Sequence, residues 1–196
     1  AELGITWPRL LSPYKWTPSR RYIPQTYLRF RYEFLNRKSA YILNSSTLNF
    51  GYKWNESERK THDLTLAEII YVQPRNITDA YKAQMDTVPT LRRIVDRQFS
   101  IGPNYTFTST NSLDVNKKST YYFKGGINLS GNILGLIQGA DYNKGEKKKI
   151  FGAAYSQFVK VELDGRHYLK LGGYNELATR IMVGMSYSYG NSNGLP

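Results

Sequence analysis

Hydrophobic residues alternate with small or polar residues in one segment of this chain after another. In residues 99–108, Phe99, Ile101, Tyr105 and Phe107 occupy odd positions, whereas Ser, Gly, Asn and Thr fill the even ones. Successive side chains of a β-strand point to opposite faces, so such a segment forms a strand with one apolar face and one polar face. The apolar positions are rich in aromatic residues and the polar positions in Gly, Asn, Ser, Lys and Arg. This combination is typical of a sheet that separates lipid from water.

The overall composition does not exclude such a sheet, although the mean hydropathy of −0.53 resembles that of a water-soluble chain. The 196 residues are enough for one domain or for part of a larger barrel. No run of about 18 apolar residues occurs, which excludes a transmembrane helix. Alternation hides apolar strands from window averages, so a transmembrane β-barrel is not excluded. The 17 Tyr, 8 Phe and 3 Trp favour strands and the aromatic girdles of membrane interfaces.

The formal charge of +12 favours an anionic partner, either nucleic acid or anionic lipid. The basic residues are spread over turns, loops and polar strand positions, whereas the aromatic residues occupy the opposite faces. A platform for stacking bases needs cations and aromatic rings on the same surface. We therefore expect lipid, and no nucleic acid, as the partner.

The alternation predicts an all-β fold in which consecutive strands form an antiparallel up-and-down meander. We expect eight strands near residues 2–11, 26–36, 46–55, 62–74, 97–111, 119–137, 155–171 and 177–190. Thr78 as N-cap, with Tyr81, Met85 and Val88 at helical spacing, predicts one short helix near 77–88. The connections after the fourth and sixth strands are long, and those after the first, third, fifth and seventh are short to moderate. Long loops on one side and short turns on the other are typical of transmembrane barrels.

Two sets of strand residues are predicted to form the two faces of the sheet. The residues expected to face lipid are Trp7, Phe30, Trp54, Phe99, Ile101, Tyr105, Phe107, Tyr121, Ile127, Leu129, Val159, Val161, Ile181 and Val183. A ladder of charged residues expected to face a watery interior comprises Lys124, Lys160, Glu162, Asp164, Arg166 and Arg180. These charges are expected to pair across neighbouring strands. The alternative is a site that steers a passing polypeptide.

A basic, glycine-containing loop is expected between the sixth and seventh strands, over residues 139–152. It carries Lys144, Lys147, Lys148 and Lys149. A run of this kind is usually a solvated loop. The alternative is that its cations contact the phosphates of a glycolipid in the outer leaflet.

Residues suited to catalysis are few. The chain has no Cys and only two His, His62 and His167, which lie far apart in the sequence and lack metal-binding spacing. Glu162 and Asp164 resemble the carboxylate pair of a glycosidase, but the neighbouring cations favour ionised, paired carboxylates. The sequence thus predicts a protein that is not an enzyme and needs no cofactor.

The final third of the chain carries a family resemblance. The stretches Tyr155–Tyr168, Leu177–Gly184 and Tyr189–Ser192, followed by Leu195 and Pro196, resemble the BamA/TamA family of outer-membrane protein assembly factors. The similarity is greatest to its Bacteroidota branch, called TamL. Weaker similarity to that branch occurs at Trp7–Leu11, Pro24–Thr26, Gly51–Trp54 and His62–Leu64.

The resemblance implies a sixteen-stranded barrel in the outer membrane of a Gram-negative bacterium, preceded by periplasmic POTRA domains. This chain would supply about half of the barrel, roughly its fourth to eleventh strands. The implied function is the non-enzymatic folding, insertion or translocation of other outer-membrane proteins. The implied partners are outer-membrane lipid, client proteins, other assembly-machine subunits and glycolipid head groups. The family's Arg-Gly-Phe/Tyr loop would follow Pro196, and the strands that form its opening seam would lie outside these residues.

Two other functions remain open at this point. The first is a passive porin or transporter barrel, in which Lys160, Glu162, Asp164 and Arg166 would tune permeation. The second is a soluble β-sheet binding domain. It differs from both barrels because its aromatic faces would be buried against a second layer.

Overall fold

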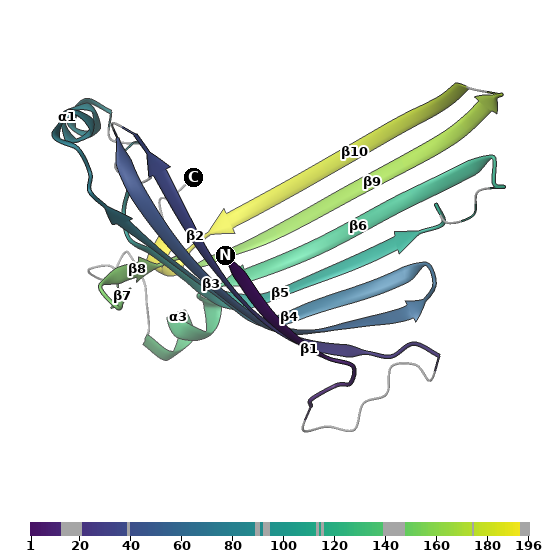
Figure 1. The fold of residues 1–196 in the computed structure, drawn as a ribbon, viewed down its shortest axis with the longest axis horizontal. Coiled ribbons are helices and arrows are strands. Elements are labelled where there is room, and N and C mark those ends of the chain that lie inside the picture. The colour runs from purple at the N-terminus through teal and green to yellow at the C-terminus, as the bar shows by residue number, and fades with distance from the viewer. Residues whose placement is uncertain are drawn as a thin grey trace.

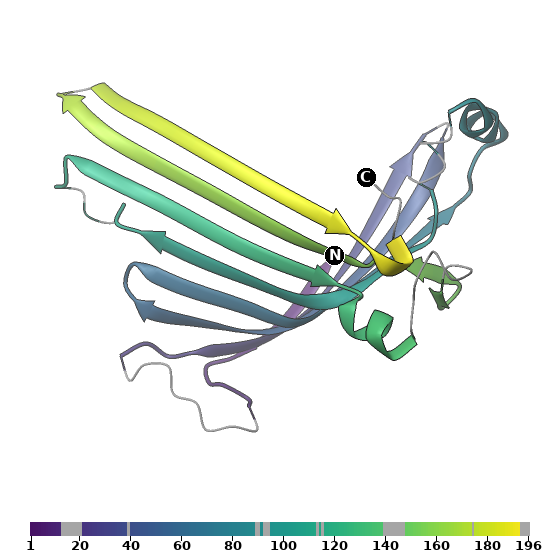
Figure 2. The ribbon, with the colours of Figure 1, turned by 180° about the vertical axis from the view of Figure 1, so that it is seen from behind.

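A computed structural model of the chain describes residues 1–12, 21–38, 40–88, 91, 95–112, 114, 116–138, 148–173 and 175–192. It confirms an all-β fold built on one antiparallel meander, in which neighbouring strands of the sheet follow chain order (Figure 1). The strands of the meander are β1 (Glu2–Trp7), β2 (Gln25–Arg37), β3 (Tyr41–Ser57), β4 (Lys60–Arg75), β5 (Gln98–Thr110), β6 (Ser119–Ser130), β9 (Phe158–Gly172) and β10 (Asn175–Ser188). The sheet curls strongly but does not close into a barrel, because β1 and β10 form its two edges (Figure 2).

The remaining elements lie in the connections. Helix α1 (Asp79–Thr87) follows β4, and helix α3 (Asn132–Gln138) follows β6. A small hairpin of β7 (Lys149–Ile150) and β8 (Ala153–Tyr155) precedes β9, and β8 also pairs in parallel with β5. A short 3-10 helix, η2 (Gly190–Ser192), follows β10. Thr78 caps α1 as the sequence predicts, since its Oγ1 accepts a 3.3 Å hydrogen bond from the Tyr81 backbone N–H.

The two longest connections lie at the same end of the sheet. The end that we call the hairpin end carries the turns at 58–59, 111–118 and 173–174 and the connection 8–24. The opposite end, the loop end, carries the short turn 38–40 and the two long connections, 76–97 and 131–157. The long connections thus follow the fourth and sixth strands of the meander, as the sequence predicts.

Some strand bounds differ from the prediction. The strand expected over 119–137 ends at Ser130, so Ile133 belongs to α3 and not to a strand. The cause is Gly131, whose φ of 66° turns the chain out of the sheet in a conformation that glycine adopts readily. The strand expected over 155–171 begins only at Phe158, because Tyr155 pairs with β5 as part of β8. The first strand is also shorter and ends at Trp7.

Two small clusters of buried side chains lie at the loop end. In the first, Tyr41 of β3 packs edge-to-face on Tyr81 of α1, with ring centroids 5.1 Å apart, and Val95 is buried beside them. In the second, Phe99 of β5 is buried with Ala153 and Tyr155 of β8. The described parts of the long connections therefore pack against the ends of the strands, and within the described residues most of the sheet is a single layer (Figure 1).

Candidate functional site

The strand register places the six predicted charged residues on one face of the sheet, the polar face. Lys124 is directly opposite Asp164, and Asn128 is opposite Lys160. Arg180 is opposite Arg166. Residues directly opposite one another in an antiparallel ladder point to the same face, and so do residues two apart in one strand. Lys124, Lys160, Glu162, Asp164, Arg166 and Arg180 therefore share one surface.

The same register places all of the predicted apolar residues on the opposite face, the apolar face. The connected pairs run from one edge of the sheet to the other and include Phe30 with Leu48, Tyr105 with Ile127, and Ile127 with Val161. On this face lie Trp7, Phe30, Trp54, Phe99, Ile101, Tyr105, Phe107, Tyr121, Ile127, Leu129, Val159, Val161, Ile181 and Val183. The sheet therefore separates one apolar surface from one polar surface along its whole width.

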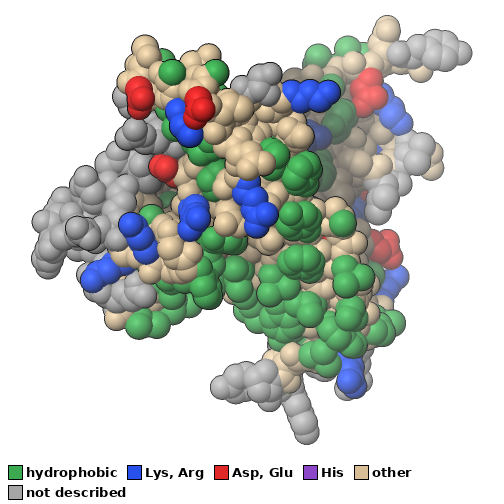
Figure 3. Space-filling model, turned by 60° about the vertical axis from the view of Figure 1, so that its left-hand side comes forward, with side chains coloured by type: hydrophobic (Ala, Val, Ile, Leu, Met, Phe, Trp, Pro, Cys, Tyr) green, Lys and Arg blue, Asp and Glu red, His purple; other side chains and the backbone are tan. Residues whose placement is uncertain are grey.

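Most of the apolar face lies open in this chain. Ile181 is 74% exposed, Tyr187 71% and Ile5 52%. Figure 3 shows hydrophobic side chains gathered over a broad area, with most charged side chains around its borders. Contiguous apolar surfaces of this kind are rare on monomeric soluble proteins and mark contact with a membrane or a partner.

One part of the apolar face, which includes the predicted lipid-facing residues Phe99 and Ile101, is packed against β8. Phe99 is only 6% exposed, because Ala153 and Tyr155 of β8 cover it. Ile101 packs against the same cluster. The cover forms because β6 ends at Ser130, which leaves the loop end of β5 free to pair with β8.

A row of aromatic rings crosses the apolar face towards the hairpin end. Trp54 of β3 stacks on His62 of β4 at a centroid distance of 5.0 Å, and His62 lies 5.1 Å from Phe107 of β5. Phe107 lies 6.3 Å from Phe123 of β6. The His62 Nδ1 atom also forms a 2.8 Å hydrogen bond with the Tyr105 hydroxyl group. The His62 Nε2 atom lies 3.4 Å from Glu56 Oε2. His62 therefore joins a row of aromatic contacts to the end of β3.

The charged ladder is held together by Asp164. Both carboxylate oxygens of Asp164 accept hydrogen bonds from Arg166, at 2.7 and 3.2 Å, and from Arg180, at 2.9 and 3.0 Å. The Arg166 guanidinium group also lies 5.0 Å from the centre of the Tyr122 ring. The predicted pairing across strands is therefore present between Asp164 and Arg180. Among the described residues, Lys124 forms no ion pair, although it lies opposite Asp164.

The two carboxylates on β9 are each paired with cations. Glu162 forms a 2.8 Å ion pair with Lys160, and Asp164 is held by two arginines. A glycosidase instead uses one of its two carboxyl groups as a general acid. In the described part of the chain no group of three or more His, Cys, Asp or Glu residues could hold a metal ion.

A second polar cluster lies on the polar face across β2, β3 and β4, and the sequence analysis missed it. The Tyr27 hydroxyl group donates a 2.6 Å hydrogen bond to Asp63 and lies 2.8 Å from the Thr65 hydroxyl group. The Arg29 guanidinium group lies 4.4 Å from the centre of the Tyr27 ring. Tyr27 lies two and four residues before Arg29 and Arg31, which indicates that it shares their face, but no pattern within the strand indicates a partner two strands away.

The polar face is hollowed between β5 and β10. The hollow has a volume of about 450 Å³. Its lining includes the whole charged ladder, namely Lys124, Lys160, Glu162, Asp164, Arg166 and Arg180, together with Asn104, Thr106, Tyr122 and Asn128. With four cations and two carboxylates, the ladder makes this surface polar and basic, and suited to contact with water, ions or a polar chain.

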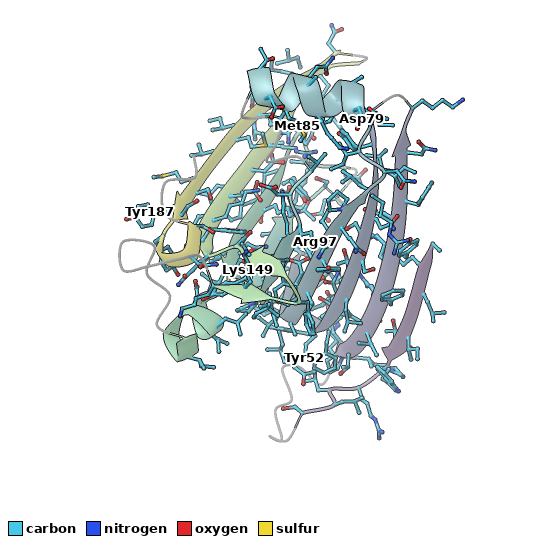
Figure 4. The ribbon with its side chains drawn as sticks, turned by 90° about the vertical axis from the view of Figure 1, so that its left-hand side faces the viewer. Tyr52, Asp79, Met85, Arg97, Lys149 and Tyr187 are labelled. Carbon is cyan, nitrogen blue, oxygen red and sulfur yellow. The ribbon has the colours of Figure 1, made fainter. Side chains whose placement is uncertain are left out.

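The basic loop is described only in part. Lys148 and Lys149 are exposed, and Lys149 begins β7 (Figure 4). The other two predicted lysines, Lys144 and Lys147, lie outside the described residues. The backbone of Lys148 is held by the Asn191 side chain, through hydrogen bonds of 2.7 and 3.0 Å.

Comparison with known proteins identifies no relative. No protein-family model, no curated protein and no solved structure matches this chain. Among the described residues, no helix has the length and apolar character needed to cross a membrane. A function is therefore inferred from the two faces of the sheet and from the resemblance found in the sequence.

Proposed function

We propose that this sheet is part of the wall of a transmembrane β-barrel in a bacterial outer membrane. We further propose that the protein is a non-enzymatic assembly factor, which folds and inserts or translocates other outer-membrane proteins. The observation that carries the first proposal is the register, which separates an open apolar face from a charged face across the strands from β1 to β10. The resemblance to the BamA/TamA family, and to its TamL branch, supports the second.

The lengths of the strands suit a membrane wall. A tilted strand needs about 9–11 residues to cross a bilayer, and the strands from β2 to β10 in the meander have 12 to 17. Lipid offers no hydrogen-bond partner to an unpaired backbone N–H or C=O group, so every strand of a wall in lipid must be paired on both sides. The proposal therefore requires further strands beside β1 and β10.

The aromatic row adds to the argument. Aromatic girdles lie at the two membrane interfaces of transmembrane barrels. The contacts from Trp54 through His62 and Phe107 to Phe123 run across four neighbouring strands, close to the turn at 58–59. A soluble binding domain would instead bury these faces against a second layer, and the described residues place no such layer over the middle of the apolar face.

A porin or transporter barrel is the second candidate, and the hollow on the polar face favours it. The ladder from Lys124 to Arg180 lines that hollow and would line a channel in the closed barrel. The two candidates share the fold but differ in what the protein does. Depletion of an assembly factor lowers the folded amounts of other outer-membrane proteins, whereas loss of a porin changes only permeability.

The wall itself is tested by labelling two neighbouring residues of β10. Met185 lies on the apolar face opposite Val161, and Ser186 lies on the polar face opposite Lys160. These 196 residues contain no Cys, so Met185→Cys and Ser186→Cys each add the one thiol of this segment, and any Cys elsewhere in the full-length protein is replaced by Ser. In the full-length protein refolded into liposomes, we expect a water-soluble maleimide to label Ser186→Cys and to spare Met185→Cys. Equal labelling of both thiols would overturn the proposal.

Heat-modifiable migration on a semi-native gel provides an independent check on the same preparation. A closed membrane barrel migrates faster before boiling than after it. A full-length protein that stays soluble and monomeric without detergent would contradict the barrel and support the soluble domain.

A further inference from the structure

The connection between β6 and β9 carries three large apolar side chains that point into open space. In α3, Ile133 is 65% exposed and Ile137 is 76% exposed. Phe151, in the turn between β7 and β8, is 80% exposed. Ile133 and Ile137 are four residues apart and therefore share one side of the helix. Apolar side chains are rarely so exposed in groups unless they contact a membrane or a partner.

These side chains lie on the apolar side of the sheet. Leu134 of α3 and Ile150 of β7 pack against the cluster of Phe99, Ala153 and Tyr155. The Phe151 ring lies 6.1 Å from the Phe99 ring. Since Phe99 belongs to the apolar face, α3 and the β7–β8 hairpin extend that face at the loop end. Figures 1 and 2 show α3 beside the end of β6, outside the curl of the sheet.

A buried polar network holds this unit in place. The Asn191 side chain bonds to the backbone of Lys148 and of Tyr155, and its backbone N–H donates a 2.9 Å hydrogen bond to Gln157 Oε1. Gln157, Asn191 and Ser192 are all nearly fully buried. The Tyr189 hydroxyl group also donates a hydrogen bond to the Asn132 side chain. The exposed apolar side chains are therefore presented on a fixed support.

Two cations accompany them. Lys148 and Lys149 are exposed and enter the hairpin directly before Phe151. Within the described residues neither lysine forms an ion pair. Lysine beside exposed apolar side chains is the combination found where a protein sits on an anionic lipid surface, because the apolar groups enter the acyl boundary and the ammonium groups reach the phosphates.

We propose that α3 and the β7–β8 hairpin form a docking surface for the bilayer interface. Ile133, Ile137 and Phe151 enter the boundary between head groups and acyl chains, and Lys148 and Lys149 bind lipid phosphates. The occupant is lipid and not protein, because the surface continues the apolar face at the loop end and because two exposed lysines precede Phe151 in the hairpin. This inference rests on the proposed membrane wall and adds a contact between the two lysines and anionic lipid at the loop end.

The test measures the environment of single cysteines that carry an environment-sensitive fluorophore. Ile133→Cys and Phe151→Cys probe the docking surface, and Gln84→Cys is the matched control, since Gln84 is exposed on α1 at the same end of the sheet. The full-length protein is reconstituted in vesicles that contain lipids brominated near the head group. We expect a blue-shifted, strongly quenched emission at Ile133→Cys and Phe151→Cys, and a water-like emission at Gln84→Cys.

A fourth variant separates this inference from the proposed function. Met185→Cys lies on the apolar face of β10 and reports on the wall alone. Water-like emission at Ile133→Cys and Phe151→Cys, with lipid-like emission at Met185→Cys, would overturn the docking surface and leave the wall intact. Water-like emission at Met185→Cys would contradict the wall itself. Shielding of Ile133→Cys without quenching by brominated lipid would identify a protein partner and also overturn the proposal.

The role of the cations is tested by Lys148→Gln combined with Lys149→Gln. Quenching at Phe151→Cys should be stronger in phosphatidylcholine vesicles that contain phosphatidylglycerol than in phosphatidylcholine alone. The double substitution should abolish that difference and leave the heat-modifiable migration unchanged, because the bonds from Asn191 involve the Lys148 backbone. A difference that persists in the double variant would contradict phosphate binding by these lysines.

Discussion

The Tyr27 hydroxyl group donates a 2.6 Å hydrogen bond to Asp63, although the two residues lie on strands that are not neighbours. β3 runs between them, and the side chain of Tyr27 crosses it at Gly51, its direct partner in the register. A Cβ atom at Gly51 would lie 2.7 Å from the Tyr27 hydroxyl oxygen and 2.5 Å from the Leu64 carbonyl oxygen. The absence of a side chain at Gly51 is therefore what lets one tyrosine join three strands.

Gly51→Val should destabilise the sheet, because the added side chain collides with the Leu64 backbone carbonyl group, displaces Tyr27 and leaves Asp63 without its donor. Losing a hydrogen bond to a charged group costs about 1.5–3 kcal/mol. Gly126→Ala is the control, since Gly126 lies on the same face and an added Cβ would meet no atom closer than 3.8 Å. The free energy of unfolding in urea, measured on the full-length protein in detergent micelles, should fall for Gly51→Val and change little for Gly126→Ala. Equal losses would rule out the crossing as the cause.

Val161→Arg should impair insertion into lipid more than Thr106→Arg. Val161 lies on the apolar face, where an arginine near the bilayer midplane costs about 2–4 kcal/mol. Thr106 lies on the polar face opposite Asp63, which offers the new cation a partner. The measurement is the fraction of full-length protein that becomes heat-modifiable after refolding into liposomes. Similar fractions for both variants would contradict the assignment of the faces.

Asp164→Asn should lower the thermal stability of the folded protein more than Glu162→Gln does. Asp164 holds two arginines from β9 and β10, and its side chain is only 14% exposed, whereas Glu162 pairs with one lysine and its side chain is 61% exposed. Losing the charge of Asp164 leaves Arg166 and Arg180 side by side without a counter-charge. The midpoint of the heat-modifiable transition at low and high salt provides the measurement. A larger effect of Glu162→Gln would show that the ladder does not depend on Asp164.

Asp114, in the turn between β5 and β6, should titrate below the usual range of an aspartate. The Lys117 ammonium group, which bonds to its carboxylate at 2.6 Å, and the Arg59 guanidinium group, at 2.7 Å, lower the pKa of Asp114. A lowered pKa in the folded state means that this stabilisation is fully present above the ordinary aspartate pKa of about 3.9 and is lost as the pH falls through the lowered value.

The titration of Asp114 can be followed by the NMR signal of a labelled side-chain carboxyl carbon in the full-length protein. The pKa of Asp114 should return towards its ordinary value in Lys117→Gln, since that hydrogen bond is the main cause of the shift. Lys82→Gln is the control, because Lys82 pairs with Asp79 at the opposite end of the sheet. An unchanged pKa of Asp114 in Lys117→Gln would contradict this account.

The two faces of the sheet follow from the sequence because alternation is a local property of the extended chain. Each side chain points opposite to its neighbour wherever a strand forms, so Lys160 and Val161 take opposite faces whatever pairs with β9. The meander, the helix capped by Thr78 and the long connections could be read in the same way, from signals within a few residues. The sequence also predicted that charged residues on one face would pair across neighbouring strands, and the contact between Asp164 and Arg180 is of this kind.

Contacts between distant segments could not be predicted from the sequence, because they depend on the strand register and on the turns, which no local pattern contains. Tyr155 covers Phe99 only because Gly131 turns the chain out of β6 and frees the end of β5. Tyr27 reaches Asp63 only because the register puts Gly51 beneath it. The sequence predicted a strand where α3 forms, because Ile127, Leu129 and Ile133 all occupy odd positions. Alternation assigns each side chain to a face, whereas its neighbours are set by how the strands pair and where the chain leaves the sheet.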